Sequence, residues 1–204
     1  TVPPGMGLFL EETWRMRPEV NAFVSETFYE GRLEPAPVTA SRSVDDGVGV
    51  RFLAVPHAGH RTAAPEEALA VAAEIERLLG TPYRDGEVVR PLGPEDFIVV
   101  APYNAHVRCL REAIPDTRVR SGTVDKFQGQ QATVVFFSMA SSSGEDVSRG
   151  LGFLFSRNRL NVAVSRARCL AYVVASPRLL EASCRSVEEM RLANALCRFV
   201  EVAE

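Results

Sequence analysis

Apolar runs of strand length alternate along the chain with segments whose apolar positions recur every three or four residues. This alternation is typical of a parallel sheet covered by helices on both faces, and it predicts the α/β class. The strand candidates are rich in Val, Ile and Phe, as strands buried on both faces are. They are Val48–Val55, Phe97–Ala101, Thr133–Met139 and Cys169–Ala175.

Helix candidates lie between these runs. Pro18 can start one helix, and Pro65 can start another that Gly80 closes, because proline suits the first helical turn and glycine the residue after the last. Further helices are expected at Asn104–Ile114, Asn158–Arg168 and Ser186–Val200. Surface loops rich in Pro, Gly, Ser or charged residues are expected at Thr81–Pro94 and Ser141–Gly150.

The chain has 204 residues, of which 46% are hydrophobic, so one globular domain spanning residues 1–204 is expected. The formal net charge of −3 argues against a protein that binds nucleic acid through overall basicity, so any such contact must be local. Lys126 is the only lysine, and it stands in Val-Asp-Lys-Phe-Gln. A phosphate-binding Walker A loop needs Lys beside Gly and Ser or Thr, so the chain carries none and should not hydrolyse ATP unaided.

Four cysteines stand far apart without metal-ligand spacing, and they are expected to be reduced core thiols. No stretch is long and apolar enough to span a membrane, and residues 1–10 lack the features of a signal peptide, so a cytoplasmic setting is expected. His57 and His60 have no Cys or carboxylate cluster to complete a metal site and are expected to be loop histidines. Asp45-Asp46 predicts a turn before a strand, and Asp125 is given no catalytic role.

The segment Asn158–Arg168 carries the sharpest chemical signal. As a helix, it would bury an apolar face and project Arg159 and Arg166, seven residues apart, along one flank, with Asn161 and Arg168 on the other. Two guanidinium groups held in this way would form a rigid clamp for phosphate oxygens. Ordinary solvated arginines are the alternative, but the neighbouring Asn and Ser and the strand that follows weigh against it.

Three other segments are polar at positions where a ligand could bind. Gly122–Gln131 is a loop with donors and acceptors directly before a buried strand, although polar turns are common. Glu11–Pro18 places Trp14 beside two arginines, and stacking on a base or burial in the core are equally good interpretations. Ala101–Asn104 follows a buried strand at the edge where open α/β sheets place ligands, although Tyr103 could equally be a packing residue.

Taken in their order along the chain, the four segments resemble the C-terminal motifs of superfamily 1 helicases, in the branch of the nonsense-decay and immunoglobulin-mu-binding helicases. Trp14–Pro18 with Phe28–Leu33 resembles motif IV, Gly122–Gln131 resembles motif V, and Gly152–Arg168 resembles motif VI. Ala101–Asn104 is similar to a PYxxQ motif. The resemblance spans roughly residues 10–177 and implies the second RecA-like lobe, of the AAA_12 type. The sequence of the segment resembling motif VI is most similar to that of bacterial proteins that fuse a RecB-like nuclease to such a helicase.

The resemblance implies that this lobe closes onto ATP and Mg²⁺ held by a first RecA-like lobe of the same parent chain. Arg166 would be an arginine finger and Arg15 its partner at the γ-phosphate. Gly129 would approach the γ-phosphate, Gln128 would link nucleotide state to the strand-binding side, and Trp14 would stack on adenine.

Single-stranded nucleic acid is the other implied partner, with DNA expected before RNA. Pro102, Tyr103, Asn104 and Thr123 would contact its sugar-phosphate backbone, giving binding with little sequence preference. The branch also implies 5′ to 3′ movement.

The chain departs from the family pattern at several positions, including Trp14, where the family usually has Tyr. Gln131 stands where a ribose-binding Glu is usual, and an amide bonds a hydroxyl less strongly than a carboxylate does. His106 replaces the Gln of PYxxQ. Ala140-Ser141 lies where many relatives carry an arginine that holds nucleic acid, so the grip on the strand is expected to differ. Gln131 and Arg159 complete the residues assigned to the nucleotide.

Two other functional classes remain open from the sequence. A nucleic-acid-binding or regulatory module could have kept the fold and lost the motor, which Gln131 favours and Arg15, Gln128 and Arg166 oppose. A stand-alone small-molecule enzyme would need a glycine-rich nucleotide loop that the chain lacks, and it ranks last.

Overall fold

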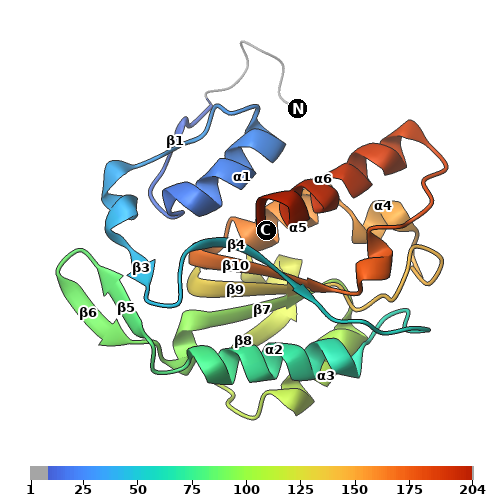
Figure 1. Ribbon diagram of the computed structural model, residues 1–204, viewed down its shortest axis with the longest axis horizontal. Helices are drawn as coiled ribbons and strands as arrows, with labels where there is room; N and C mark the ends of the chain where they lie inside the picture. Colours follow the sequence, from blue (N-terminus) through green and yellow to red (C-terminus); the bar gives the residue numbers. More distant parts are fainter. Residues whose placement is uncertain (1–8, 204) are drawn as a thin grey trace.

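The computed structural model describes residues 9–203, and its centre is a parallel sheet of five strands in the order β4-β10-β9-β7-β8 (Figure 1). The strands are β4 (Gly49–Ala54), β7 (Phe97–Ala101), β8 (Arg120–Thr123), β9 (Ala132–Ser138) and β10 (Ala167–Ala175). β10, the last strand in sequence, lies between β4 and β9. The carboxyl ends of all five strands therefore meet at one edge of the sheet and their amino ends at the other.

Helices cover both faces of the sheet, and Figure 1 shows the resulting three layers. One face packs against α1 (Pro18–Tyr29), α5 (Arg157–Val164) and α6 (Val187–Ala203), with the short α4 (Leu151–Leu154) beside α6. The other face packs against α2 (Pro65–Leu78) and α3 (Asn104–Ala113). The arrangement confirms the predicted α/β class with a parallel sheet between helices.

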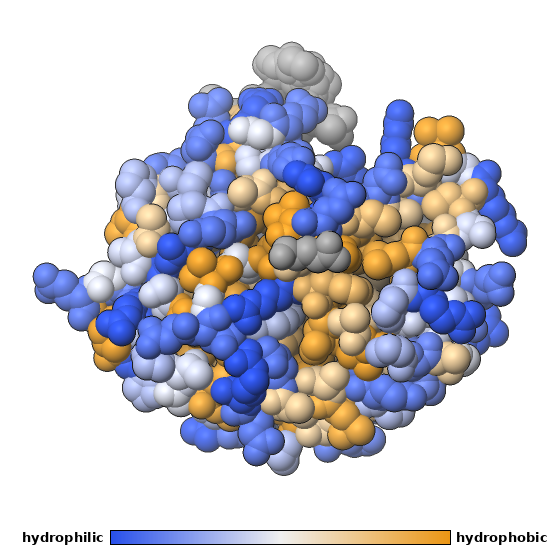
Figure 2. All heavy atoms as spheres, viewed as in Figure 1, coloured by the Kyte–Doolittle hydropathy of each residue, from blue (hydrophilic) through white to orange (hydrophobic). Residues whose placement is uncertain are grey.

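Alternating side chains of each strand enter two different cores. In β9, Val135 and Phe137 pack on the side of α1, α5 and α6, whereas Val134 and Phe136 pack on the side of α2 and α3. All four are at most 1% exposed. Because both faces are buried, the strand reads as a continuous apolar run, which is why the sequence revealed it. On the face shown in Figure 2, apolar side chains gather over the middle of the molecule, around the edge strand β4 and part of α2.

The predicted strands and most helices are confirmed within three residues of their expected ends, and the largest of these differences is at the end of α6, which runs to Ala203 instead of Val200. The exception among the helices is Asn158–Arg168, because α5 ends at Val164 and Ser165 caps it. Arg166 lies beyond that cap, and Arg168 belongs to β10. Arg159 and Arg166 therefore do not share a helical flank, and the predicted two-arginine clamp on one helix is wrong.

The predicted loop Thr81–Pro94 is instead a β-hairpin of β5 (Pro82–Asp85) and β6 (Val88–Pro91). It pairs with β3 (Ser43–Val44) to form a small antiparallel sheet. A further parallel pair joins β1 (Glu12–Thr13) to β2 (Glu34–Pro35). These short strands expose many of their side chains, so they lack the apolar runs by which strands are recognised in a sequence.

Several expectations for single residues change as well. His57 lies in a loop, as expected, but its side chain is 0% exposed and is hydrogen-bonded to the side chains of Ser142 and Glu67. All four cysteines are free, but only Cys169 is buried in the core; Cys109, Cys184 and Cys197 are half-buried. Asp45-Asp46 does form a turn. Most of the segment tested for a signal peptide lies outside the described residues. Within residues 9–203, no helix has the length and apolarity to cross a bilayer.

Candidate functional site

The amino-terminal edge of the sheet brings the segments resembling motifs V and VI together. Ala132 and Ala167 begin the neighbouring strands β9 and β10 and are paired in register. The amide of Ala132 also donates to the carbonyl of Arg166 at 3.1 Å. Gln131 and Arg166, each directly before its strand, therefore lie next to one another.

The segment resembling motif IV lies along the same edge. The amide of Arg17 donates to the carbonyl of Arg168 at 3.0 Å, which ties residues 15–17 to the start of β10. Nη1 of Arg15 donates to the carbonyl of Ser165 at 3.0 Å. Arg15 and Arg166, far apart in sequence, are thereby brought to one place.

These two arginines have no counter-charge among the described residues, where neither forms an ion pair. Burial and the nearby charge of Arg166 lower the pKa of Arg15, and burial lowers the pKa of Arg166. Nε of Arg166 is buried without a hydrogen-bond partner in the described structure. A buried donor without a partner is costly, and two adjacent cations repel one another. The pair is therefore suited to an anion, and phosphate oxygens fit its donors.

A third arginine positions the main chain that carries this pair. Nη1 of Arg42 donates to the carbonyls of Trp14, at 3.1 Å, and Arg15, at 2.8 Å. Nε of Arg42 contacts Oδ1 of Asp85, on β5, at 3.2 Å, and Arg168 contacts the other oxygen of Asp85. Burial opposes ionisation of Asp85, but the charges of Arg168 and Arg42 lower the pKa of its carboxyl. The hairpin thus holds the backbone of Arg15 through a single carboxylate.

Trp14 projects into solvent with 66% of its surface exposed. The core interpretation left open by the sequence is therefore wrong. An exposed indole beside a cationic pair is available to stack on a planar ring.

The segment resembling motif V crosses the sheet from one edge to the other. Thr123 ends β8 at the carboxyl-terminal edge, and a 3₁₀ helix, Val124–Phe127, leads back to Ala132 at the amino-terminal edge. Gln128, Gly129 and Gln131 are exposed along this return. Gly129 has φ +81°, a left-handed conformation that favours glycine. The predicted polar loop is thus a strand end plus a helical turn, and it connects the two edges.

The carboxyl-terminal edge holds the residues expected to bind nucleic acid. Pro102 and Tyr103 follow β7, and Asn104 is the exposed first residue of α3. Tyr103 is only 6% exposed, and its ring packs at a tilt against that of Phe153, with ring centroids 5.4 Å apart. Its hydroxyl is buried without a partner among residues 9–203. Tyr103 is therefore mainly a packing residue, and Asn104 and the half-buried Thr123 are the accessible groups.

Arg159 lies apart from Arg166. Its guanidinium stands over the ring of Phe153, 4.0 Å from the centroid, and that ring adjoins Tyr103. The structure thus groups Arg159 with the carboxyl-terminal edge. Its assignment to the nucleotide stays a prediction that this geometry does not favour.

Sequence reasoning missed a buried polar cluster beside the same edge, centred on Glu67. Glu67 and His106 are both 0% exposed. Oε1 of Glu67 lies 2.9 Å from Nε2 of His57, and Oε2 accepts from Oγ of Ser138 at 2.6 Å. An acidic residue in the first turn of a helix is common, because it interacts favourably with the helix dipole, so the position of Glu67 in α2 gives no sign of a polar cluster. The spacing of Glu67, His57 and Ser138 along the sequence does not indicate that they are in contact.

A family model, AAA_12, described as an AAA domain, matches residues 5–178. Because the match covers most of the chain, the chain belongs to the AAA_12 family of AAA domains.

Several curated relatives are helicases or nucleic-acid-binding proteins by name. The DNA polymerase alpha-associated DNA helicase A of Saccharomyces cerevisiae is 30% identical over 196 residues, covering 85% of this chain and 28% of the relative. The DNA-binding protein SMUBP-2 of Rattus norvegicus is 29% identical over 180 residues, covering 76% and 17%. The probable RNA helicase armi of Drosophila melanogaster is 38% identical over 89 residues, covering 40% and 8%.

The chain thus spans less than a third of the length of each of these relatives. Among solved structures, the C-terminal domain of a possible DNA helicase from Lactobacillus strain WCFS1 aligns with a TM-score of 0.48 and 14% identity. That alignment covers 90% of this chain and 96% of the other.

Proposed function

We propose that this chain is the second RecA-like lobe of an ATP-dependent superfamily 1 helicase that translocates along single-stranded nucleic acid. The observation that carries the proposal is the pair Arg15 and Arg166, which is partly buried at one sheet edge with no counter-charge from residues 9–203. DNA is the preferred substrate in this proposal, as the name of the yeast relative also suggests. The parent protein would act in the cytoplasm and carry the ATP-binding first lobe and a RecB-like nuclease.

On the nucleotide side, Arg15 and Arg166 would meet the terminal phosphate of ATP, whose Mg²⁺ is held by the first lobe. Their charges would offset the negative charge that grows on the phosphoryl group during its transfer. Trp14 would stack on the adenine, and Gln131, adjacent to Arg166, would bond the ribose. Gln128 and Gly129 lie on the return of the motif V segment, where they would face the same nucleotide.

On the strand side, Asn104 and Thr123 would contact the sugar-phosphate backbone beside Pro102 and Tyr103. These residues lie at the carboxyl ends of the adjacent strands β7 and β8. The motif V segment joins this edge to the amino-terminal edge, so a shift of Gln128 on nucleotide binding would move Thr123. That connection supplies a physical route for coupling the two ligands.

The test is strand-stimulated ATP hydrolysis by the full-length protein, with Arg166→Ala compared against the wild type. Loss of a finger should lower kcat by a factor of about 10³ or more while circular dichroism stays unchanged. Arg198→Ala is the matched control, because Arg198 is an arginine paired on the surface of α6 with Glu26. It should leave kcat unchanged.

Normal hydrolysis by Arg166→Ala, with the fold intact, would overturn the finger assignment. A full-length protein that binds single strands but never hydrolyses ATP would instead be a binding or regulatory module. Gln131, an amide at the expected ribose-binding position, is the observation that favours this second function.

A further inference from the structure

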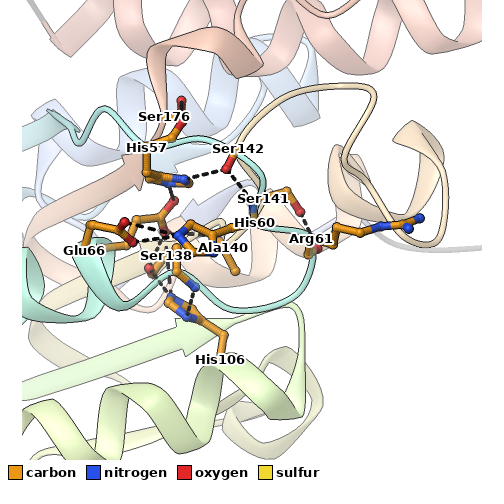
Figure 3. Close-up of polar contacts among 12 residues, drawn as sticks. His57, His60, Arg61, Glu66, His106, Ser138, Ala140, Ser141, Ser142 and Ser176 are labelled. Atoms are coloured by element: carbon orange, nitrogen blue, oxygen red, sulfur yellow. Dashed lines mark hydrogen bonds and ion pairs between the residues drawn. The ribbon is translucent and has the colours of Figure 1, made fainter.

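The loop between β4 and α2 is fastened to the loop that follows β9. The amide of Ser142 donates to the carbonyl of His60, and the amide of His60 donates to Oγ of Ser142, both at 2.9 Å. Oγ of Ser141 donates to the carbonyl of Arg61 at 2.9 Å. Figure 3 shows these contacts converging at the carboxyl-terminal edge of the sheet. The main chain of His60-Arg61 is therefore fixed beside the end of β9.

The buried cluster around Glu67 fixes the loop after β9 in turn. Oε2 of Glu67 accepts from the amide of Ala140 at 2.9 Å, and Ala140 adopts φ +68°, a conformation rarely taken by residues other than glycine. Nδ1 of His57 lies 2.8 Å from Oγ of Ser142. Since the side chains of His57 and Glu67 are 0% exposed, water does not compete with these bonds.

The same cluster ties the loop to α3. The amide of Ala64 donates to Nδ1 of His106 at 3.3 Å, and Nε2 of His106 lies 2.6 Å from Oγ of Ser138. His106 stands two residues after Asn104 on that helix. Arg61 and Asn104 are thus held by one rigid network.

Arg61 differs from the rest of this network because its side chain is exposed. Figure 3 shows it extending away from the buried cluster. Its guanidinium makes no hydrogen bond or ion pair within residues 9–203, although its main chain is fixed. A cation on a preorganised support needs little further ordering to bind an anion.

We propose that Arg61 binds a backbone phosphate of single-stranded nucleic acid. The inference deepens the proposed function, on which it rests, by extending the strand track. Arg61 lies at the end of β9, Asn104 at the end of β7 and Thr123 at the end of β8, three adjacent strands in that order. Strands lie about 4.8 Å apart, so the three positions span on the order of 10 Å along one edge. An extended polymer can contact all three.

A free nucleotide is the other source of phosphate, and the geometry argues against it. Arg15 and Arg166 lie at the amino-terminal edge, and Arg61 lies beyond the carboxyl end of β9. The seven residues of β9 separate the two edges by about 20 Å. A nucleotide seated on the arginine pair therefore does not reach Arg61 from this lobe.

The experiment measures equilibrium binding of the full-length protein to a fluorescent single-stranded oligonucleotide at several salt concentrations. Each phosphate contact on a single strand contributes about 0.7 to the slope of log K against log salt. Arg61→Ala should therefore reduce the magnitude of the slope by about 0.7 and weaken binding about 5-fold at 0.1 M salt, equally for different sequences. Arg61→Lys keeps the charge and should keep the slope.

The matched control is Arg118→Ala, which removes an exposed arginine paired with Asp116 just before β8, at the opposite edge. Its slope should equal that of the wild type. An unchanged slope for Arg61→Ala overturns the proposal, as does a change confined to the KM for ATP, which would assign Arg61 to a nucleotide. A wild-type protein that binds no single strand overturns the proposed function itself, so the two failures are distinguishable.

Discussion

Arg15 and Arg166 lie together, partly buried, at the amino-terminal edge of the sheet. Each stands in a recognisable motif, so both could be singled out as candidates. Their proximity depends on the bond from Arg15 to the carbonyl of Ser165, which joins residues 150 positions apart. Contacts of that kind follow from the register of strands and not from local spacing. Only the resemblance to superfamily 1 helicases implied that the two arginines meet, and their partial burial was not expected.

Trp14 yields a prediction at the same scale. Because the indole is 66% exposed, Trp14→Ala should leave the fold intact. If it stacks on adenine, its loss should raise the KM for ATP about tenfold, since stacking on a base is worth about 1–3 kcal/mol. Steady-state kinetics of the full-length protein measure this change.

Comparison with a nucleotide that lacks a purine ring provides the control for Trp14. The variant and the wild type should hydrolyse a pyrimidine triphosphate with more similar KM values. An equal rise for both nucleotides would show that Trp14 supports Arg15 rather than the base.

The buried cluster marks the limit of residue-level prediction. Nothing in the sequence indicated that His57 and Glu67 are buried, because polar residues in a loop and in a first helical turn usually face water. Their burial is possible only because Ser138, Ala140 and Ser142 supply partners from a distant segment.

At the scale of elements, long apolar segments were predicted well and short or amphipathic ones poorly. The helix predicted over Asn158–Arg168 extends four residues beyond the end of α5 at Val164. Ala167 would be buried both in a longer helix and in the strand, so its apolar character does not distinguish the two conformations. Pairing of Ala167 with Ala132 in the sheet decides the outcome. The hairpin of β5 and β6 was missed because Val88 and Val89 are exposed.

That hairpin gives a prediction of its own. Asp85→Ala removes the carboxylate that orients Arg42 and Arg168, so the backbone carrying Arg15 should loosen. We expect kcat for ATP hydrolysis to fall about tenfold with little change in KM, because a finger acts mainly on the transition state. Steady-state kinetics of the full-length protein test this separation.

Asp45→Ala is the matched control for Asp85. Asp45 is 45% exposed and pairs with Arg84 on the same strand as Asp85, at 3.4 Å. It should leave both constants unchanged. Equal effects of the two substitutions would mean that the hairpin contributes only general stability.

At the scale of the whole molecule, the layers follow from the sequence but the connections do not. Apolar runs of strand length alternating with amphipathic helices predict a parallel sheet between layers of helices. The position of β10 between β4 and β9 has no local signal. This placement brings Arg166 beside Gln131. The two candidate sites lie at opposite edges because Arg166 and Gln131 precede their strands, whereas Thr123 and Asn104 lie at the carboxyl ends of theirs.

The buried cluster should also make the stability of the whole chain depend on pH. Burial, with the charges of His57 and His60, lowers the pKa of His106 from 6.5 to about 4, against the opposing effect of Glu67. The folded state therefore binds its proton less readily than the unfolded state. The contribution of His106 to the free energy of unfolding is fully present above pH 6.5 and is lost as the pH falls towards 4.

His106→Gln tests this dependence, because an amide keeps hydrogen-bonding capacity and does not titrate. Between pH 7 and pH 5, His106 should account for about 2 kcal/mol of the lost free energy of unfolding. In urea unfolding experiments, the variant should therefore lose about 2 kcal/mol less free energy of unfolding between pH 7 and pH 5 than the wild type does. An identical loss in both proteins would assign the pH dependence to other groups.

The place of β10 in the sheet also bears on how the chain is made. β4 lies at the sheet edge and pairs with β10 alone among the described strands, yet β4 ends at Ala54 and β10 begins at Ala167. A ribosome adds about 5–20 residues per second, so β4 leaves the exit tunnel on the order of ten seconds before its partner exists. Until then its apolar side chains have no sheet to join. The sheet of the nascent chain must therefore remain incomplete, and open to chaperones, until β10 has been translated.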